Sequence, residues 1–438
     1  MCTSRIVSRI FQIAFVSIAF ISCKKESAIL KKQKAEIVLS AARLSSDKIS
    51  LVKDTVYVLA ENLQINANQE LTIEAGTLIK VKNQVSVHIN SGGKLVAIGT
   101  KDAPIVLTSD AVKGTAGRSP NYWSGLVIDG PAETKLTYVR IEFAGGGFTP
   151  SLLLRNIDNT AILNNIQVSY SFARTSFEFS GGNCNAFNLL SFASANTDFK
   201  LSNGYTGKLQ NLLAYRLPYF AGGIGLREAL AALLLQGITT FPSISNFSVI
   251  GPDLQPGIST NYIPPNAGFG SFPATSLLVS NDAKFHIRNA VLAGFPKGGF
   301  YISSAKSGIS LQIGESDFTN SFVHSNDSSR AFYIPANLIP LVPPVTAKDF
   351  KVFMLQPQYH NQLILNTSEL QLTDPYNYDH DPNPSPKQGS PLLSGANFEV
   401  PVFNDPFFKR VNYRGAIGED NWLLGWTNFI PLQTDYNN

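Results

Sequence analysis

The sequence predicts an all-β protein: a right-handed parallel β-helix solenoid with a short helical insertion and a C-terminal cap. Short apolar strands and polar turns return in steps of 22 to 24 residues, at Asn165, Asn188 and Asn211, at Phe177 and Phe199, and at Leu71 and Leu95. Each segment keeps the same pattern of strands and turns while most of its residues differ, as expected of stacked repeats. Leucine-rich repeats have a similar period, but they need a fixed Leu-x-x-Leu-x-Leu frame that these segments lack.

The composition limits the classes of partner. Charged residues make up 15% of the 438 residues, against about 25% in ordinary soluble proteins. Neutral Asn, Ser, Thr and Gly must therefore cover much of the solvent-facing surface. The net charge is +4, and two of these charges, Arg5 and Arg9, lie in the first 22 residues. Without a strongly basic face, we expect no nucleic-acid partner.

Residues 1–22 have the pattern of an export signal. A basic start precedes an apolar run from Ile10 to Ile21, which is too short to span a bilayer. Ser22 then precedes Cys23, and this junction resembles the lipobox of bacterial lipoproteins, which implies that Cys23 becomes the lipidated first residue of the mature chain. A plain cleaved signal with an incidental cysteine is the alternative. We therefore expect a cell-envelope protein, an outer-membrane lipoprotein exposed at the surface, with the membrane as partner through its lipid.

The remaining chain divides into three expected parts. Residues 23–53 are rich in Lys, Ser and Ala without a clear strand pattern, so they predict a tether with room for a short helix. Residues 54–330 hold the β-helix, and 331–438 hold terminal rungs, Pro-rich loops and a cap. With such processing Cys2 would be lost and Cys23 would be acylated, which leaves Cys184 without a disulfide partner. We expect Cys184 to be a small buried apolar residue.

Several segments resemble a known family. "LTIEAGTLIKVKNQVSVHINSGGKLVAIGTKDAPIVLTS", residues 71–109, with "YWSGLVIDG" and "LTYVRIEFAGG", is similar to the opening rungs of pectin-lyase-like β-helix proteins found as largely uncharacterised envelope lipoproteins. "GSPLLSGANF" and "YRGAIGEDNWLLGWTNF" resemble the closing region of the same proteins. The resemblance implies the fold and carries no settled activity.

Two segments interrupt the repeat. Residues 225–237, "GLREALAALLLQG", are Gly-bounded and rich in helix formers, so they predict a helix inserted between rungs. Its role is either packing on the solenoid flank or contact with a partner or second copy. The Pro-rich stretch at 333–345 predicts a surface loop.

The three spaced asparagines predict a structural ladder. Asn165, Asn188 and Asn211 would lie one above another, with their side-chain amides bonding along the solenoid axis. Tyr170, Phe192 and Tyr215 follow these asparagines by five, four and four residues, which places an aromatic ring in nearly one slot of successive rungs. At about 4.8 Å per rung, such a column could bind a sugar chain. The alternative is an internal stack that fills the core.

Two further groups have a functional and a structural interpretation. Calcium could find oxygen ligands at Asp374, Asp379 and Asp381, with Asn377. Turns at the Asp-Pro and Asn-Pro steps explain the same residues without a metal. Trp422 and Trp426 could form a sugar platform, but aromatic residues that close an open solenoid end are the favoured interpretation.

Motifs for catalysis are mostly missing. Asn196 to Asp198, "NTD", matches one fragment of the polygalacturonase motifs, without a paired Asp-Asp, a Gly-His-Gly or an Arg-Ile-Lys. The acids do not recur at the rung period, and the five histidines lack metal spacing. The sequence therefore favours a non-catalytic, lipid-anchored binding or scaffold module of the envelope, whose partner is a polysaccharide or another envelope protein. A carbohydrate-active lyase or hydrolase with an unrecognised site, and a structural spacer or adhesin, are the alternatives.

Overall fold

The computed structural model describes residues 34–39, 46–110, 122–172, 175–217, 231–251, 275–295, 298–325, 328–335, 347–375, 377 and 381–436. The chain divides into two units, Met1–Gln33 with Asn438, and Lys34–Asn437. The fold below is that of the second unit. No helix among the described residues is long and apolar enough to cross a bilayer.

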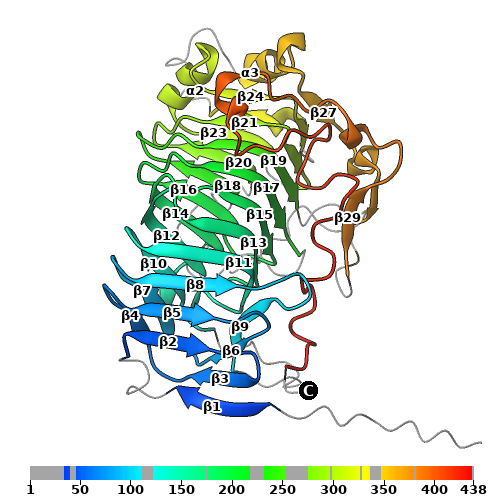
Figure 1. The fold of residues 1–438 in the computed structure, drawn as a ribbon. Coiled ribbons are helices and arrows are strands. Elements are labelled where there is room, and N and C mark those ends of the chain that lie inside the picture. The colour runs from blue at the N-terminus through cyan, green and yellow to red at the C-terminus, as the bar shows by residue number, and fades with distance from the viewer. Residues whose placement is uncertain are drawn as a thin grey trace, which may run out of the picture. The chain divides into compact units, whose positions relative to one another are not determined.

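Short strands coil into a stack of rungs that form two large sheets (Figure 1). Sheet A contains β1 (Ala35–Leu39), β2 (Lys48–Leu51), β3 (Thr55–Leu59), β5 (Glu70–Ile73), β6 (Leu78–Val81), β8 (Lys94–Ile98), β9 (Ile105–Ser109), β11 (Glu133–Glu142), β13 (Ile162–Ser169), β15 (Ala186–Phe192), β17 (Lys208–Tyr215), β19 (Ser243–Ile250), β21 (His286–Arg288), β22 (Val291–Ala293), β24 (Asp317–Thr319), β25 (Phe322–His324) and β27 (Gln362–Ile364). Sheet B contains β4 (Leu63–Ile65), β7 (Ser86–Ile89), β10 (Gly125–Asp129), β12 (Leu152–Ile157), β14 (Phe177–Gly182), β16 (Phe199–Ser202), β18 (Ala231–Gln236), β20 (Thr275–Ser280), β23 (Phe300–Ile302) and β26 (Phe332–Tyr333).

The register of the strands follows the sequence repeat. Leu71 lies opposite Leu95 in parallel strands β5 and β8, and Phe177 lies opposite Phe199 in β14 and β16. The two phenylalanine rings stack with their centroids 5.0 Å apart. Inward side chains of successive rungs therefore meet in one continuous core, which also contains Cys184. Burial raises the pKa of the Cys184 thiol to about 12, as suits a small packing residue. The predicted parallel β-helix is confirmed.

An asparagine stands at one corner of successive rungs in sheet A. Asn165, Asn188 and Asn211 have φ angles of 53°, 58° and 58°, in the left-handed region that asparagine tolerates better than most residues. The Nδ2 of Asn188 donates to Oδ1 of Asn165 at 3.4 Å, and that of Asn211 donates to Oδ1 of Asn188 at 2.9 Å. These bonds form the ladder along the solenoid axis. Asn246, Asn289 and Asn320 continue the left-handed position toward the C-terminus.

The prediction of a helix over residues 225–237 is wrong for the part of this segment that the structure describes. Residues 225–230 lie outside the described part, and Ala231–Gln236 form strand β18 between β16 and β20. Leu233 and Leu235 are buried inside the solenoid, and Leu234 on the opposite face is also buried. A continuous apolar run suits a strand with both faces covered, so stacking overrides helix propensity here.

Residues within the predicted tether also belong to the solenoid. Strand β1 pairs with β3 and strand β2 pairs with β5, both in parallel. Ile49 and Leu51 point inward while Lys48 and Ser50 are exposed, so the strand alternation is present but only four residues long. The solenoid therefore begins earlier than residue 54.

Among the described residues, two α-helices lie near the C-terminal end of the solenoid: α2 (Ala305–Gln312) and α3 (Ala347–Met354). Phe350 and Met354 of α3 pack into the main core against rings of the last rungs, so α3 acts as the C-terminal cap. Of the predicted Pro-rich loop, residues 336–345 lie outside the described part. The smaller elements are η1 (Gly146–Phe148), η2 (Ser328–Arg330), η4 (Pro357–Tyr359), η5 (Thr367–Leu370), β28 (Leu372–Asp374), β29 (Asn383–Pro386), η6 (Pro391–Leu393) and η7 (Pro401–Asn404).

Residues 395–436, here called the C-terminal strap, run back along the outer face of sheet A (Figure 1). Side-chain amides of the sheet hold the backbone of the strap: Asn289 bonds Asn397, Gln210 bonds Lys409, and Gln167 bonds Asn428, each through both its oxygen and its nitrogen. At the end of the strap, the Tyr436 hydroxyl donates to the buried Glu142 carboxylate at 2.7 Å.

Trp422 and Trp426 belong to the strap. Trp426 is buried, packs edge-on against Tyr138 with ring centroids 5.6 Å apart, and accepts a hydrogen bond from Arg140 at its backbone oxygen. The two indole rings are 6.3 Å apart. The pair covers the side of the solenoid. The expectation that it closes an open end of the solenoid is therefore wrong.

Candidate functional site

The outer face of sheet B offers a surface that changes along the solenoid. One column of outward side chains passes through successive strands, from β7 to β26, and the register of the strands aligns them: His88, Val127, Leu153, Glu178, Lys200, Leu234, Leu278, Tyr301 and Tyr333. Their neighbours along each strand, such as Val87 and Ile89, belong to the core. The strand alternation therefore places this column on the outside.

A charged cluster lies at the N-terminal end of this face. Oδ2 of Asp129 is 2.8 Å from Nε2 of His88, and Oδ1 of Asp129 is 2.9 Å from Nη1 of Arg155. The Arg155 side chain is 46% exposed. A carboxylate that holds an imidazole beside a guanidinium can orient both groups toward a ligand, and the imidazole can exchange a proton with a bound hydroxyl.

The middle of the face is more covered. Nζ of Lys200 lies 3.4 Å from a carboxylate oxygen of Glu178, and both side chains are little exposed. Leu234 and Leu278 follow in the next rungs and are buried, with Tyr301 packed against them. This stretch is therefore a packed apolar and ion-paired surface.

An aromatic cluster lies at the C-terminal end of the face. Tyr301 of β23 and Tyr333 of β26 are register partners, and their ring centroids are 5.1 Å apart at an angle of 47°. The guanidinium carbon of Arg330 lies 4.8 Å from the Tyr333 ring centroid. All three side chains are half-buried. The cluster combines flat apolar surface with hydrogen-bond donors.

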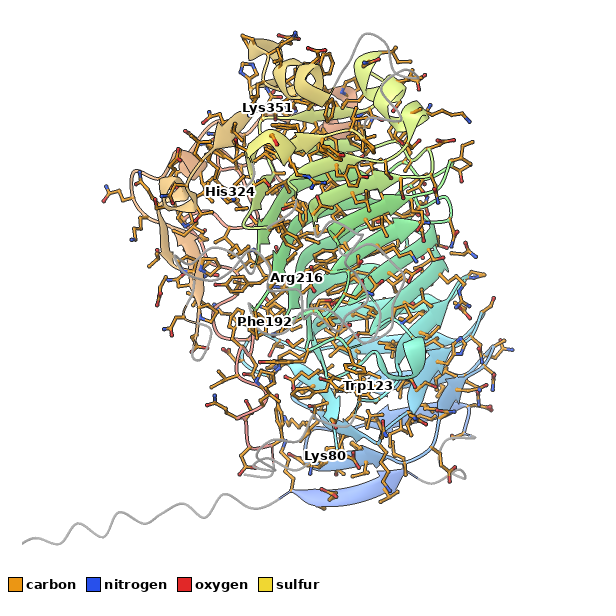
Figure 2. The ribbon with its side chains drawn as sticks, turned by 180° about the vertical axis from the view of Figure 1, so that it is seen from behind. Lys80, Trp123, Phe192, Arg216, His324 and Lys351 are labelled. Atoms are coloured by element: carbon orange, nitrogen blue, oxygen red, sulfur yellow. The ribbon has the colours of Figure 1, made fainter. Side chains whose placement is uncertain are left out.

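The predicted aromatic column is a buried structure. Phe192 and Tyr215 are fully buried and Tyr170 is 8% exposed, so no solvent-facing platform exists at these residues. Phe429 of the strap covers the column, and its ring centroid lies 4.9 Å from that of Phe192. Phe192 is labelled in Figure 2. Phe192 pairs with Ser169 and with Tyr215, which places Tyr170 one residue outside the shared slot. The platform hypothesis is corrected for both reasons. The rings pack outside the solenoid core, between sheet A and the strap.

Asp198 of the "NTD" fragment is inaccessible. Its Oδ2 accepts from Nε of Arg216 at 2.8 Å, and its Oδ1 accepts from the Ser191 hydroxyl at 2.6 Å. Both charged side chains are almost fully buried. Burial raises the pKa of Asp198, while the Arg216 charge opposes the shift. The pair is a structural ion pair at the corner before β16.

The acids predicted for calcium are only partly placed. Asp374 ends strand β28 and is exposed, as is Asp381. Asp379 lies outside the described residues, and so does Cys23. Within the described ranges, no group of three His, Cys, Asp or Glu side chains is arranged to hold a metal ion.

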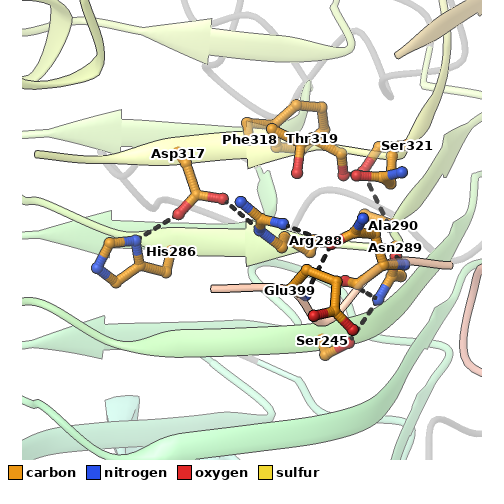
Figure 3. A network of polar contacts seen from close by, with 12 residues as sticks. Ser245, His286, Arg288, Asn289, Ala290, Asp317, Phe318, Thr319, Ser321 and Glu399 are labelled. Carbon is orange, nitrogen blue, oxygen red and sulfur yellow. Dashed lines mark hydrogen bonds and ion pairs between the residues drawn. The ribbon is translucent and has the colours of Figure 1, made fainter. Parts of the chain in front are cut away.

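A second polar network joins sheet A to the strap (Figure 3). His286 and Arg288 of β21 both bond the carboxylate of Asp317 in β24. Arg288 also donates to Oδ1 of Asn397 in the strap at 2.9 Å. Because its members hydrogen-bond one another and the strap, we assign this network a structural role: it holds the strap against sheet A.

The comparison with protein families supports the architecture. The chain matches the pectate-lyase-like β-helix domain over residues 43–137 and 132–332, which together exceed half of its length. The chain belongs to this family. The residues that match this pectate-lyase-like β-helix domain include nearly all strands of sheet B. Comparison with curated proteins and with solved structures found no match.

The tyrosine cluster was missed by sequence reasoning, although a signal exists. The triplet Phe-Tyr-Ile occurs at residues 300–302 and again at 332–334. The Phe and Ile of each copy are buried in the core, and the Tyr points outward. The copies are 32 residues apart because helix α2 lengthens the rung, so a search at 22 to 24 residues passes over them. The His88, Asp129 and Arg155 cluster has no comparable signal in the sequence.

Proposed function

We propose that the protein is a lipid-anchored module of the cell envelope that binds polysaccharide without cleaving it. The observation that carries the proposal is the outer face of sheet B, where carboxylates contact imidazole, guanidinium or ammonium groups of neighbouring rungs. Asp129 is shared by His88 and Arg155, and Glu178 faces Lys200. The side chains of this face differ along the solenoid, but the strands that carry them are stacked at a regular spacing, which suits a repeating polymer.

Polysaccharide is the favoured partner for two reasons. Stacked strands repeat about every 4.8 Å, which is close to the length of one sugar unit. The family description also names a lyase that acts on a polysaccharide. Another envelope protein remains the alternative partner, and a spacer or adhesin is the alternative without a glycan ligand.

The proposed anchor is Cys23, which follows the export signal. The Cys23→Ser chain should lose labelling by a fatty-acid analogue and move from the membrane fraction to the soluble fraction. Unchanged membrane retention of Cys23→Ser would refute the anchor.

The binding function is tested with the soluble, full-length Cys23→Ser chain on an array of polysaccharides. We expect retention on a subset of glycans, with no new reducing ends and no unsaturated products after incubation. Absence of binding to any glycan would remove polysaccharide as partner and leave either another envelope protein as partner or the spacer or adhesin.

A catalytic alternative is favoured by one observation, the imidazole of His88 held by the Asp129 carboxylate beside Arg155. Such a group can act as a general base. Release of products by the Cys23→Ser chain, and its loss in a His88→Ala variant of that chain, would establish this alternative instead.

A further inference from the structure

Tyr301 and Tyr333 are two outward rings in consecutive rungs of sheet B. They are register partners in parallel strands, 5.1 Å apart, and each stands between an inward Phe and an inward Ile. The backbone of each rung thus fixes the position of its ring. Unlike Phe192 and Tyr215, which the strap covers completely, these two rings are only half-buried.

Arg330 adds a cation beside the rings. Its guanidinium lies 4.8 Å from the Tyr333 ring centroid, and no ion pair of Arg330 occurs among the described residues. Arg155 and Lys200, the cations farther along the same face, each have a carboxylate partner. The Nε of Arg330 is buried without a hydrogen-bond partner in the described part of the chain, so the guanidinium keeps unused donor capacity.

The backbone around Arg330 is held in place. The Arg330 carbonyl accepts from the Gly299 N–H at 3.2 Å, and Nζ of Lys351 in α3 donates to the Ser328 carbonyl at 3.1 Å. The cap therefore anchors η2, which carries Arg330. A rigid support of this kind reduces the entropy that a ligand must overcome when it binds.

The rings also have an apolar base. Tyr301 packs against Leu234 and Leu278 of the two preceding strands of sheet B. Burial raises the pKa of the Tyr301 hydroxyl, and the Tyr333 hydroxyl adds to the shift while the Arg330 charge opposes it. The hydroxyl consequently stays protonated at neutral pH and can donate or accept a hydrogen bond.

We propose that Tyr301, Tyr333 and Arg330 form a sugar-binding subsite at the C-terminal end of sheet B. The half-exposed parts of the two rings pack on the C–H faces of pyranose units, and the 5.1 Å separation of the ring centroids lets one sugar chain contact both rings while it runs along the solenoid axis. The guanidinium donates to a hydroxyl or carboxylate oxygen of the chain. This inference rests on the proposed function and names the residues that carry it.

The test uses the full-length Cys23→Ser chain and a glycan that it retains on the array, with affinity measured by calorimetry. Tyr301→Ala with Tyr333→Ala should weaken binding at least about tenfold, because two aromatic contacts with the sugar chain are lost. Tyr301→Phe with Tyr333→Phe keeps both rings, and the affinity should stay within about threefold of that of the parent chain. Tyr359→Ala removes a half-buried tyrosine that packs on Phe353 outside the cluster and should leave affinity unchanged.

The outcomes separate this subsite from the general function. Unchanged affinity in the folded alanine pair would overturn the subsite while polysaccharide binding by the module stands. Failure of the parent chain to bind any glycan would overturn both. If the alanine pair does not fold, Arg330→Gln decides the matter: we expect at least about a threefold loss of affinity for an Arg donor that contacts the ligand, and unchanged affinity overturns the subsite.

Discussion

Gln210 and Lys409, 199 positions apart in the chain, are joined by two hydrogen bonds. The Gln210 Nε2 donates to the Lys409 carbonyl at 2.8 Å, and the Lys409 N–H donates to the Gln210 Oε1 at 2.8 Å. Gln167 bonds Asn428 in the same way. The side-chain amide thus takes the place of a backbone peptide group, so that the strap has a hydrogen-bonding partner on a sheet face that offers none of its own.

Gln210→Ala should loosen the strap. Two backbone groups of Lys409 lose their partner, so we expect the free energy of unfolding to fall by about 2 kcal/mol. Because the strap should open locally more often, limited proteolysis should cleave the C-terminal segment of about 40 residues sooner in this variant than in the parent chain. Gln64→Ala on the exposed position of β4 is the control and should change neither measurement. Equal protease resistance of both variants would contradict the clamp.

Phe192→Ala should behave as a core truncation. The ring is fully buried against Tyr215 and Phe429, so we expect a loss of about 3 to 5 kcal/mol in chemical denaturation. Phe187→Ala on the same strand, whose ring is half-buried near Lys409, should lose less. A smaller loss at Phe192 than at Phe187 would show that the strap does not cover the column.

Asn188→Ala should be more costly than a change at a lone left-handed residue. It removes one amide donor and one acceptor of the ladder and leaves alanine in the left-handed region, for a loss of about 2 to 3 kcal/mol. Asn156→Ala, exposed and also left-handed with φ of 52°, should lose about 1 kcal/mol. Urea unfolding of both variants measures the difference in their free energies of unfolding. Equal losses of stability would show that the ladder hydrogen bonds contribute nothing.

Acidification should destabilise the fold through His324. This residue is 4% exposed, and its Nδ1 accepts from the Gly294 N–H at 3.2 Å. Burial lowers the pKa of His324 below its ordinary 6.5, although the Glu369 charge and a hydrogen bond with the Leu365 backbone oppose the shift. The unfolded chain therefore binds a proton first as the pH falls through 6.5, and stability present above that pH is lost below it.

Unfolding midpoints in urea between pH 8 and pH 5 check this expectation. The slope near pH 6 should flatten in His324→Gln relative to the parent chain. His360→Asn, at an exposed left-handed position, should keep the parental slope. A parental slope in His324→Gln would assign the pH dependence to other groups.

The sequence by itself determined the repeat and the inward positions of the solenoid. Phe177 with Phe199 and Leu71 with Leu95 were placed correctly because a stacked rung is a local pattern: residues one period apart must meet across adjacent strands. The corner asparagines followed from the same arithmetic, since their amides need only the rung above and the rung below.

Only the tertiary structure decided which outer surfaces are free. Nothing near Phe192 or Tyr215 in the chain reveals that Phe429 covers them, because an outward aromatic in a strand has the same spacing whether solvent or a distant segment lies against it. Ala231–Gln236 became a strand for a related reason, since rungs on both sides supply partners that helix propensity cannot anticipate. Local periodicity thus sets the stack, whereas long-range packing of the strap and the cap decides that Tyr301 and Tyr333 stay half-exposed while the predicted column is buried.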